Sequence, residues 1–243
     1  MRSAWKSDPG LVRENNEDAV RTDDGYGIYL LADGMGGAPG GEVASGLAVQ
    51  AAFELLVRLF PGQAAGADIG RLLADALAAA HSAVARRALV DPHLEGMGTT
   101  LEIVVVRGAE ADFCHVGDSR IYLFRRGALS QLSSDDNYAA YLAKRDNIPL
   151  ERISPAYRHI LTQAVGVEKE LVPEIRTIGM EPGDLLLICS DGLTAVLGDA
   201  EIGTLMDRSR GDLAAMADAL VVAANARGGP DNVSVVIVEP LPP

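Results

Sequence analysis

Two long helix-like segments follow one another directly in this chain, and three strand-like segments come next with no helix between them. The helical pattern covers residues 42–60 and 69–89, where apolar residues recur every three or four positions, and Pro61 and Gly62 separate the two segments. A doubly wound parallel sheet requires strands and helices to alternate. The observed order therefore predicts an α+β fold, in which antiparallel sheets carry helices on their outside.

Short runs rich in Val, Ile and Leu, each bounded by Gly, Asp or Pro, predict the strands. They cover residues 27–32, 99–106, 111–116, 121–124, 184–189 and 233–238. The short spacings at 107–110 and 125–129 predict hairpins between neighbouring strands. Antiparallel pairing is the consequence, since only antiparallel strands can be joined so tightly.

The second half of the chain adds a third predicted helix and a long irregular segment. The helix covers residues 212–226, and two glycines and a proline at 228–230 end it. Residues 131–170 lack a clear period, which is typical of a functional loop or flap and equally of a peripheral subdomain without a catalytic role. No repeat or linker divides the chain. We therefore expect one domain over residues 1–243, with a flap subdomain at roughly 133–170.

The chain is acidic, with 34 Asp and Glu against 21 Lys and Arg and a formal net charge of −13. A nucleic-acid-binding protein needs a basic footprint to displace counterions from phosphates, and an anionic membrane surface would repel this charge. Apolar residues make up 48% of the chain, too many for a disordered acidic tail. We therefore expect a folded domain that binds neither nucleic acid nor membranes, in which the surplus carboxylates have another purpose.

The cysteines and the terminal segments bear on the compartment. Cys114 and Cys189 each lie in an apolar run, and two buried thiols make no disulfide framework, so a reducing compartment is expected. Residues 1–10 lack the apolar core of a signal peptide, and the longest apolar run, 213–226, is too short to cross a bilayer. These features predict a cytoplasmic protein. The proline-rich residues 240–243 are either a true terminus or the start of a linker.

Carboxylates recur where the apolar runs end. Asp33, Asp118 and Asp191 each follow a strand-like run, Asp231 precedes another, and Glu17 and Asp18 open a strand-like segment at residues 19–22. Any one of them alone is an ordinary turn residue. As a set, strand ends can bring them together at one rim of a sheet.

Such a cluster of carboxylates predicts bound cations. Without partners the groups would repel one another and their pKa values would rise. The hard ions Mg²⁺ and Mn²⁺ prefer carboxylate, backbone carbonyl and water oxygens. Gly34, directly after Asp33, lets a backbone carbonyl approach an ion closely. Zinc is disfavoured because His81, His93, His115 and His159 show no paired ligand spacing, and His81 is expected to be either structural or at the surface.

Two other motifs were weighed. The glycine-rich residues 33–41 fail the dinucleotide-binding frame because Pro39 occupies its third glycine position. Residues 114–120 match the Cys-x-x-Gly-x-x-Arg spacing of cysteine-dependent phosphatases, with Cys114 as nucleophile and Arg120 on the phosphate. That chemistry needs a loop that opens a helix. Here the residues after Arg120 predict a strand, and Asp118 would place a negative charge in the phosphate cradle.

Seven short motifs occur in a consistent order along nearly the whole chain. They are residues 7–18, 33–37, 98–101, 117–120, 161–166, 190–193 and 231–232. In this order they resemble the metal-dependent protein phosphatases, the protein phosphatase 2C family, in its bacterial form. The resemblance implies a four-layer αββα sandwich of two antiparallel sheets flanked by helices, with two, or three, Mg²⁺ or Mn²⁺ ions in the cleft between the sheets.

The resemblance also implies a role for each candidate site residue. Arg13 would bind the substrate phosphate. Asp33 would bridge two ions and Gly34 would give its carbonyl, while Asp191 and Asp231 would hold one ion. Glu17 would support the other ion partly through water, Asp18 would lie at the same metal site, and Asp118 would share a third ion with Asp191. The implied activity is hydrolysis of phosphoserine and phosphothreonine in proteins by metal-activated water, without a covalent enzyme intermediate. The implied partners are phosphorylated proteins, namely a serine/threonine kinase and its targets, and the expected state is a monomer.

Two departures from the family pattern are visible. Met35 stands where many eukaryotic members have a histidine proposed as general acid, so the proton donor is unassigned. Residues 135–137 read Asp-Asp-Asn where many members have Asp-His-Ser or Asp-His-Thr, which leaves the placement of the flap open. A non-catalytic phosphoprotein-binding relative is the remaining alternative, and the presence of all the expected ligands argues against it.

Overall fold

The computed structural model describes residues 1–35, 40–59, 68–167 and 169–240. The strands form two five-stranded sheets in which all pairings are antiparallel. The first sheet contains, in spatial order, β1 (Arg2–Asp8), β10 (Val233–Glu239), β9 (Leu185–Cys189), β6 (Arg120–Arg125) and β7 (Ala128–Gln131). The second contains β2 (Asp18–Asp23), β3 (Ile28–Asp33), β4 (Leu101–Arg107), β5 (Glu110–Val116) and β8 (Glu174–Gly179).

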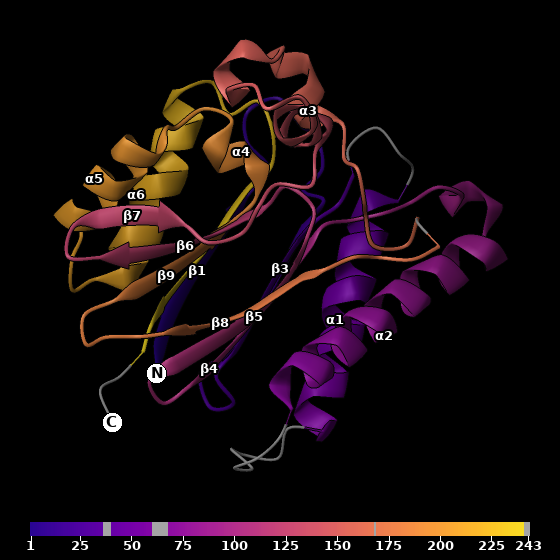
Figure 1. The fold of residues 1–243 in the computed structure, drawn as a ribbon, viewed down its shortest axis with the longest axis horizontal. Coiled ribbons are helices and arrows are strands. Elements are labelled where there is room, and N and C mark those ends of the chain that lie inside the picture. The colour runs from indigo at the N-terminus through magenta and orange to yellow at the C-terminus, as the bar shows by residue number, and fades with distance from the viewer. Residues whose placement is uncertain (36–39, 60–67, 168, 241–243) are drawn as a thin grey trace.

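Helices lie against the outer faces of the two sheets and above one end of the sandwich (Figure 1). They are α1 (Gly41–Leu59), α2 (Ile69–Val90), α3 (Tyr138–Asp146), α4 (Asp191–Thr194), α5 (Asp199–Arg208) and α6 (Leu213–Ala226), with short 3₁₀ turns η1 (Pro92–Leu94), η2 (Leu150–Arg152) and η3 (Pro155–His159). Helices α1 and α2 pack on the second sheet, and α5 and α6 pack on the first. The four-layer αββα sandwich expected from the family resemblance is confirmed.

Three buried clusters fill the spaces between the layers. One joins α1 and α2 to the second sheet, one joins α5 and α6 to the first, and the third lies between the sheets. Strand β3 shows the division, because Leu30 faces the helices while Tyr29 and Leu31 face the opposite sheet. Since both faces of each central strand are buried, these strands read as continuous apolar runs rather than as alternating patterns.

The predicted elements agree with the observed ones to within two residues at each described end. Both hairpins are confirmed, because Arg107 pairs with Glu110 and Arg125 pairs with Ala128. Strands β1, β7 and β8 and helices α4 and α5 were not predicted. The described residues do not include Gly36, Gly37 and Pro39 of the glycine-rich motif, Phe60, Pro61 and Gly62 at the predicted helix break, or Pro242 and Pro243.

The irregular segment after β7 carries α3, η2 and η3 above one end of the sandwich (Figure 1). Its base is fixed beside β5, because the backbone N–H of Gly117 donates to Asp136 Oδ2 at 3.1 Å and the Asp136 N–H donates to the Gly117 carbonyl at 2.7 Å. Asp136 therefore anchors this segment at a position where many family members have histidine. Tyr138 stacks on Tyr141 and meets Tyr157 edge to face, which gives the segment its own small aromatic cluster.

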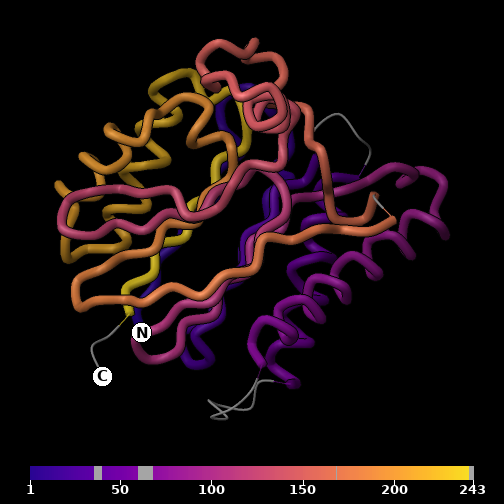
Figure 2. Tube along the Cα trace, viewed as in Figure 1, coloured from indigo at the N-terminus to yellow at the C-terminus, as the bar shows by residue number. Residues whose placement is uncertain are grey.

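The first and last strands lie side by side in the middle of the molecule (Figure 2). Their register pairs Asp8 with Val233, which brings the loop after β1 against the residues before β10. Leu11 N–H then donates to the Gly229 carbonyl at 2.8 Å. Within the parts of the chain that the structure describes, none of the helices has both the length and the hydrophobicity needed to cross a bilayer.

Candidate metal centre

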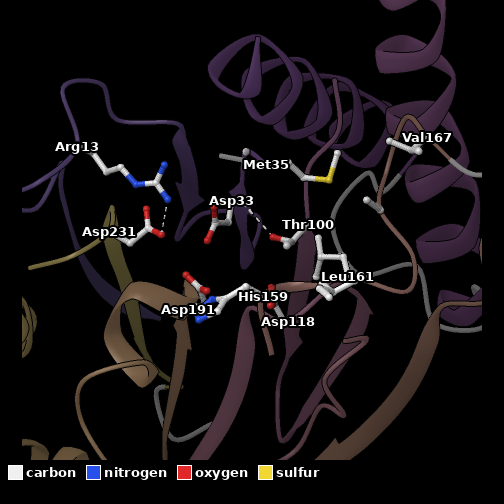
Figure 3. Close-up of a pocket in the computed structure, with 13 residues that line it drawn as sticks. Arg13, Asp33, Met35, Thr100, Asp118, His159, Leu161, Val167, Asp191 and Asp231 are labelled. Atoms are coloured by element: carbon white, nitrogen blue, oxygen red, sulfur yellow. Dashed lines mark hydrogen bonds and ion pairs between the residues drawn. The ribbon is translucent and has the colours of Figure 1, made fainter. Parts of the chain in front are cut away.

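A cavity of about 500 Å³ opens at the end of the sandwich, between the two sheets and below the flap segment. Its lining includes six of the predicted site residues, namely Arg13, Asp33, Gly34, Asp118, Asp191 and Asp231. Figure 3 shows these carboxylates pointing toward one space, with Arg13 above Asp231. The prediction that strand ends would bring the carboxylates together agrees with this arrangement.

Each carboxylate is positioned by the end of a strand. Asp33 is the last residue of β3, Asp118 lies in the turn between β5 and β6, Asp191 begins α4 directly after β9, and Asp231 comes just before β10. Asp33 thus belongs to one sheet and Asp191 and Asp231 to the other. The cavity is therefore a seam between the two sheets, and its shape depends on how they pack.

Burial and mutual repulsion raise the pKa values of these acids. The pKa of Asp33 lies well above its usual range because the group is buried and faces the charges of Asp18, Asp191 and Asp118. The pKa of Asp118 is raised in the same way by burial and by Asp191. Burial and the charge of Asp231 raise the pKa of Asp191 to about 6. The site stores unfavourable negative charge, which is the electrostatic condition for binding cations.

Arg13 reaches the cavity from the loop after β1. Its guanidinium donates to Asp231 Oδ2 at 2.8 Å, and this hydrogen bond raises the pKa of Arg13. Gly10 lets the loop approach, since a Cβ at this left-handed position (φ +78°) would stand 2.3 Å from the Asp231 carbonyl oxygen. The Asn232 side chain completes the attachment by donating to the carbonyls of Pro9 and Asn15.

Glu17 lies behind Gly34 rather than on the main cavity wall. The Asn232 side-chain oxygen accepts from its backbone N–H at 2.8 Å, and the Glu17 carbonyl accepts from the Gly34 N–H at 3.1 Å. Its carboxylate approaches the start of α1, where a Cβ on Gly41 would stand 2.6 Å from Glu17 Oε2. Burial, together with the nearby Glu42, raises its pKa. Glu17 therefore lies beside Gly34 but outside the main cavity wall.

Asp18 is the buried member of the cluster. It pairs directly with Asp33 in the β2–β3 register, so the two side chains lie on the same face of the sheet. Its Oδ2 accepts from the Ser190 hydroxyl at 2.9 Å, whereas Oδ1 is buried without a hydrogen-bond partner. Burial and the charges of Asp191 and Asp231 raise the pKa of Asp18 to about 7. An orphaned carboxylate oxygen of this kind is costly unless water or a cation satisfies it.

The donor set fits hard divalent cations. The converging carboxylates and the Gly34 carbonyl are oxygen donors, several of the carboxyls have raised pKa values, and the buried Asp18 Oδ1 has no partner. Within the described residues, no three side chains of His, Cys, Asp or Glu form a ready-made cage. Mg²⁺ keeps several water ligands and needs only one or two carboxylates. Neighbouring carboxylates also separate when no cation draws them together.

Sequence reasoning missed a buried ion pair beside the site. His115 Nδ1 lies 3.0 Å from Glu102 Oε1, and His115 Nε2 lies 3.0 Å from the Ser134 carbonyl at the base of the flap segment. Glu102 Oε2 accepts from the Thr100 hydroxyl, which itself accepts from the Asp33 N–H. The predicted hairpin at 107–110 could have revealed this ion pair, because the register that pairs Arg107 with Glu110 also pairs Glu102 with His115. His159, which lines the cavity near Asp191, was likewise not predicted.

The ion pair makes stability depend on pH. Burial alone would lower the pKa of His115, but Glu102 raises it to about 9, while burial raises the pKa of Glu102 to about 6. A histidine with a raised folded-state pKa stabilises fully below its unfolded value near 6.5 and loses that contribution as the pH rises to 9. Between pH 6 and 9.5, the unmodified chain should lose about 2 kcal/mol more unfolding free energy than the double variant His115→Asn/Glu102→Gln, which has neither titrating group. Urea unfolding at both pH values tests this, and equal losses would contradict it.

The structure argues against the cysteine-dependent alternative. Cys114 lies inside β5 with no exposed surface, and burial raises the pKa of its thiol to about 12. A reactive cysteine needs an accessible, low-pKa thiolate. Arg120 begins β6 and donates two hydrogen bonds to Asp135, at 2.8 and 2.7 Å. The matching spacing therefore corresponds to a β5–β6 turn and not to an anion-binding loop.

Fold and site together define a class of protein, a sandwich of two antiparallel sheets with a carboxylate-lined centre at the seam between them. A family model described as protein phosphatase 2C matches residues 11–230. This chain belongs to the protein phosphatase 2C family, as the seven motifs indicated.

Known relatives agree with this assignment. The serine/threonine protein phosphatase PstP of Mycobacterium tuberculosis is 38% identical over 240 residues, which cover 98% of this chain and 45% of that protein. This chain thus spans about half the length of that relative. The serine/threonine phosphatase stp of Listeria innocua is 31% identical over 246 residues, covering 98% of this chain and 96% of the relative. The solved catalytic domain of PstP in complex with two manganese ions has a TM-score of 0.82 at 38% identity, covering 97% and 96% of the two chains.

Proposed function

We propose that this chain hydrolyses phosphoserine and phosphothreonine in proteins, in a reaction that depends on Mg²⁺ or Mn²⁺. The observation that carries the proposal is the convergence of Asp33, Asp118, Asp191 and Asp231 with Arg13 on one cavity, in a member of the protein phosphatase 2C family. The relatives named above are serine/threonine phosphatases, and one was solved with two manganese ions. Oxygen donors without soft ligands suit both of these ions.

Each site residue has a proposed role that follows from its position in the cavity. Asp33, Asp191 and Asp231 are the proposed principal ligands, with the Gly34 carbonyl and Glu17 supporting one ion and Asp118 and Asp191 sharing a third. Asp18 lies at the buried side of the same cluster. When bound, such ions supply the positive charge that activates a water and offsets charge on the phosphoryl oxygens. The protein supplies fixed oxygen donors at the seam and a cavity beneath the flap segment.

Arg13 is proposed to bind the phosphate of the substrate. Its side chain is 40% exposed, so the guanidinium can turn from Asp231 toward a bound phosphate. A guanidinium offers paired N–H donors that match phosphoryl oxygens. Charge on those oxygens grows in the transition state, where such donors contribute most. Met35 carries no titratable atom and therefore does not protonate the leaving oxygen of the substrate.

We further propose that residues 1–243 act as one catalytic domain, with residues 133–170 as a flap over the cavity. His159 and Leu161 of this segment line the cavity, which supports the assignment of a flap. Two free, buried cysteines are in keeping with a cytoplasmic location. The proposed partners are a serine/threonine kinase and its phosphorylated targets, and the chain is proposed to act as a monomer.

Release of phosphate from phosphoserine and phosphothreonine peptides tests the proposal against its cysteine-dependent alternative. We expect hydrolysis with Mn²⁺, none with EDTA, and a rate for Cys114→Ala within about threefold of the unmodified chain, because this buried thiol does not reach the cavity. Hydrolysis in EDTA that Cys114→Ala abolishes would support the alternative. Manganese binding without any hydrolysis would support the non-catalytic relative.

A further inference from the structure

The cavity has two chemically distinct sides (Figure 3). Arg13 and the carboxylates occupy one side. The other side is formed by aliphatic or thioether side chains from two separate segments, namely Met35 after β3 and Ile160, Leu161, Ala164 and Val167 in the segment before β8. The metal centre and the phosphate account for the first side. Neither of them explains why the other side of the cavity is apolar.

Gly98 lets the apolar side chains meet. A Cβ at Gly98 would stand 2.5 Å from the Met35 Cε and 2.7 Å from the Val167 Cγ2, so both side chains converge over a residue that has none. The backbone fixes their approach, since Met35 N–H donates to the Gly98 carbonyl at 3.0 Å. On the other flank, Thr99 exchanges hydrogen bonds with Val165 in both directions, at 3.1 and 2.8 Å. These bonds hold the two walls together.

The hydroxyl of Thr100, which also lines the cavity, is already engaged. Thr100 Oγ1 accepts from the Asp33 N–H at 3.0 Å and lies 3.0 Å from the Ser119 hydroxyl. Meanwhile Ile160 is 50% exposed and Val167 is 48% exposed, although both line a concave surface. Apolar side chains exposed within a cavity gain free energy when another apolar group covers them.

We propose that this apolar wall binds an aliphatic side chain next to the phosphorylated residue of the substrate protein, and so selects substrates by sequence. The inference rests on the proposed function and extends it to a substrate class. Continuity argues for this occupant, because Met35 stands only two residues from Asp33 and both line one cavity. Neighbouring Cα atoms of a bound peptide are about 3.8 Å apart, so a residue beside the phosphoserine reaches the wall. An acidic neighbour would meet the carboxylates instead.

Phosphoserine peptides that differ only beside the phosphorylated residue test the inference. Leucine, glycine or aspartate is placed on each side in turn, and kcat/KM is measured with Mn²⁺. The unmodified chain should prefer leucine to glycine by roughly tenfold on at least one side. Val167→Asn should reduce this preference to about threefold or less, because it replaces a half-exposed apolar side chain of the wall with a polar one.

Val172→Asn is the matched control. Val172 is 79% exposed on the segment that follows the flap and does not line the cavity, so its substitution should leave the preference unchanged. A thermal unfolding midpoint of Val167→Asn within a few degrees of that of the unmodified chain shows that the variant folds. Equal rates on leucine and glycine peptides, or an equal effect of the two substitutions, would overturn the apolar subsite but leave the phosphatase proposal standing. Failure to hydrolyse every peptide would overturn both.

Discussion

Asp33→Asn is expected to lower kcat/KM for phosphopeptides by at least roughly a thousandfold, since the charge that holds bound ions contributes several kcal/mol to the transition state. Asp33 lies at the seam, in register with Asp18 and facing Asp191 and Asp118. Asparagine keeps the shape of the side chain and one oxygen but removes the negative charge. The measurement is phosphate release over a range of Mn²⁺ concentrations.

Loss of activity and loss of structure are separable for Asp33→Asn. The substitution relieves repulsion among buried acids, so the metal-free variant should unfold at a temperature no lower than that of the unmodified chain. Asp207→Asn is a suitable control, because Asp207 lies on the exposed surface of α5 and forms its ion pair with Arg210, away from the cavity. A rate for Asp33→Asn within tenfold of the unmodified chain would remove Asp33 from the centre.

Saturating Mn²⁺ is expected to raise the midpoint of thermal unfolding by about 5–10 °C. A ligand at one hundred times its dissociation constant stabilises by about 2.7 kcal/mol, and each kcal/mol shifts a domain of this size by about 2–4 °C. Bound Mn²⁺ also relieves repulsion between the carboxylates, which raises the unfolding midpoint further. This repulsion is present in the metal-free chain, because the pKa values of Asp33, Asp118 and Asp191 are raised there. Differential scanning calorimetry at fixed pH measures the shift.

Asp191→Asn provides the contrast for the calorimetry. It removes one proposed ligand, so most of the Mn²⁺-dependent shift should disappear, while its metal-free midpoint stays at or above that of the unmodified chain. If manganese raised the midpoints of both proteins equally, the ions would be binding elsewhere on an acidic surface. No shift in either protein would contradict a metal centre at the seam.

Much of the fold followed from sequence because the central strands are buried on both faces. Burial on two sides produces continuous apolar runs, which located β3, β4, β5, β6, β9 and β10 to within two residues. Three of the four edge strands, β1, β7 and β8, were missed for the opposite reason. Strand β1 is mostly half-exposed and carries Arg2, Ser3 and Lys6, so it shows no apolar run. Helix α5 contains Gly203, which weakens its helical signal.

The candidate site was predictable as a set of carboxylates but not as a geometry. A carboxylate at a strand end can be read from sequence, since the strand fixes where the chain leaves the sheet. That Glu17 lies behind Gly34, and that Arg13 pairs with Asp231, depends on contacts between the two ends of the chain. The apolar wall also required the structure, because Met35 and Val167 converge over Gly98, and it is the pairing of Thr99 with Val165 that brings Val167 there.

The pairing of β1 with β10 has a consequence for the order of events during synthesis. Asp231 and β10 leave the ribosome after every other part of the two sheets, yet β10 lies between β1 and β9 in the sheet. A nascent chain therefore carries Asp33, Asp118 and Asp191 before it possesses the strand that closes the seam. The full set of carboxylates can therefore meet at the seam only after β10 has entered the sheet between β1 and β9.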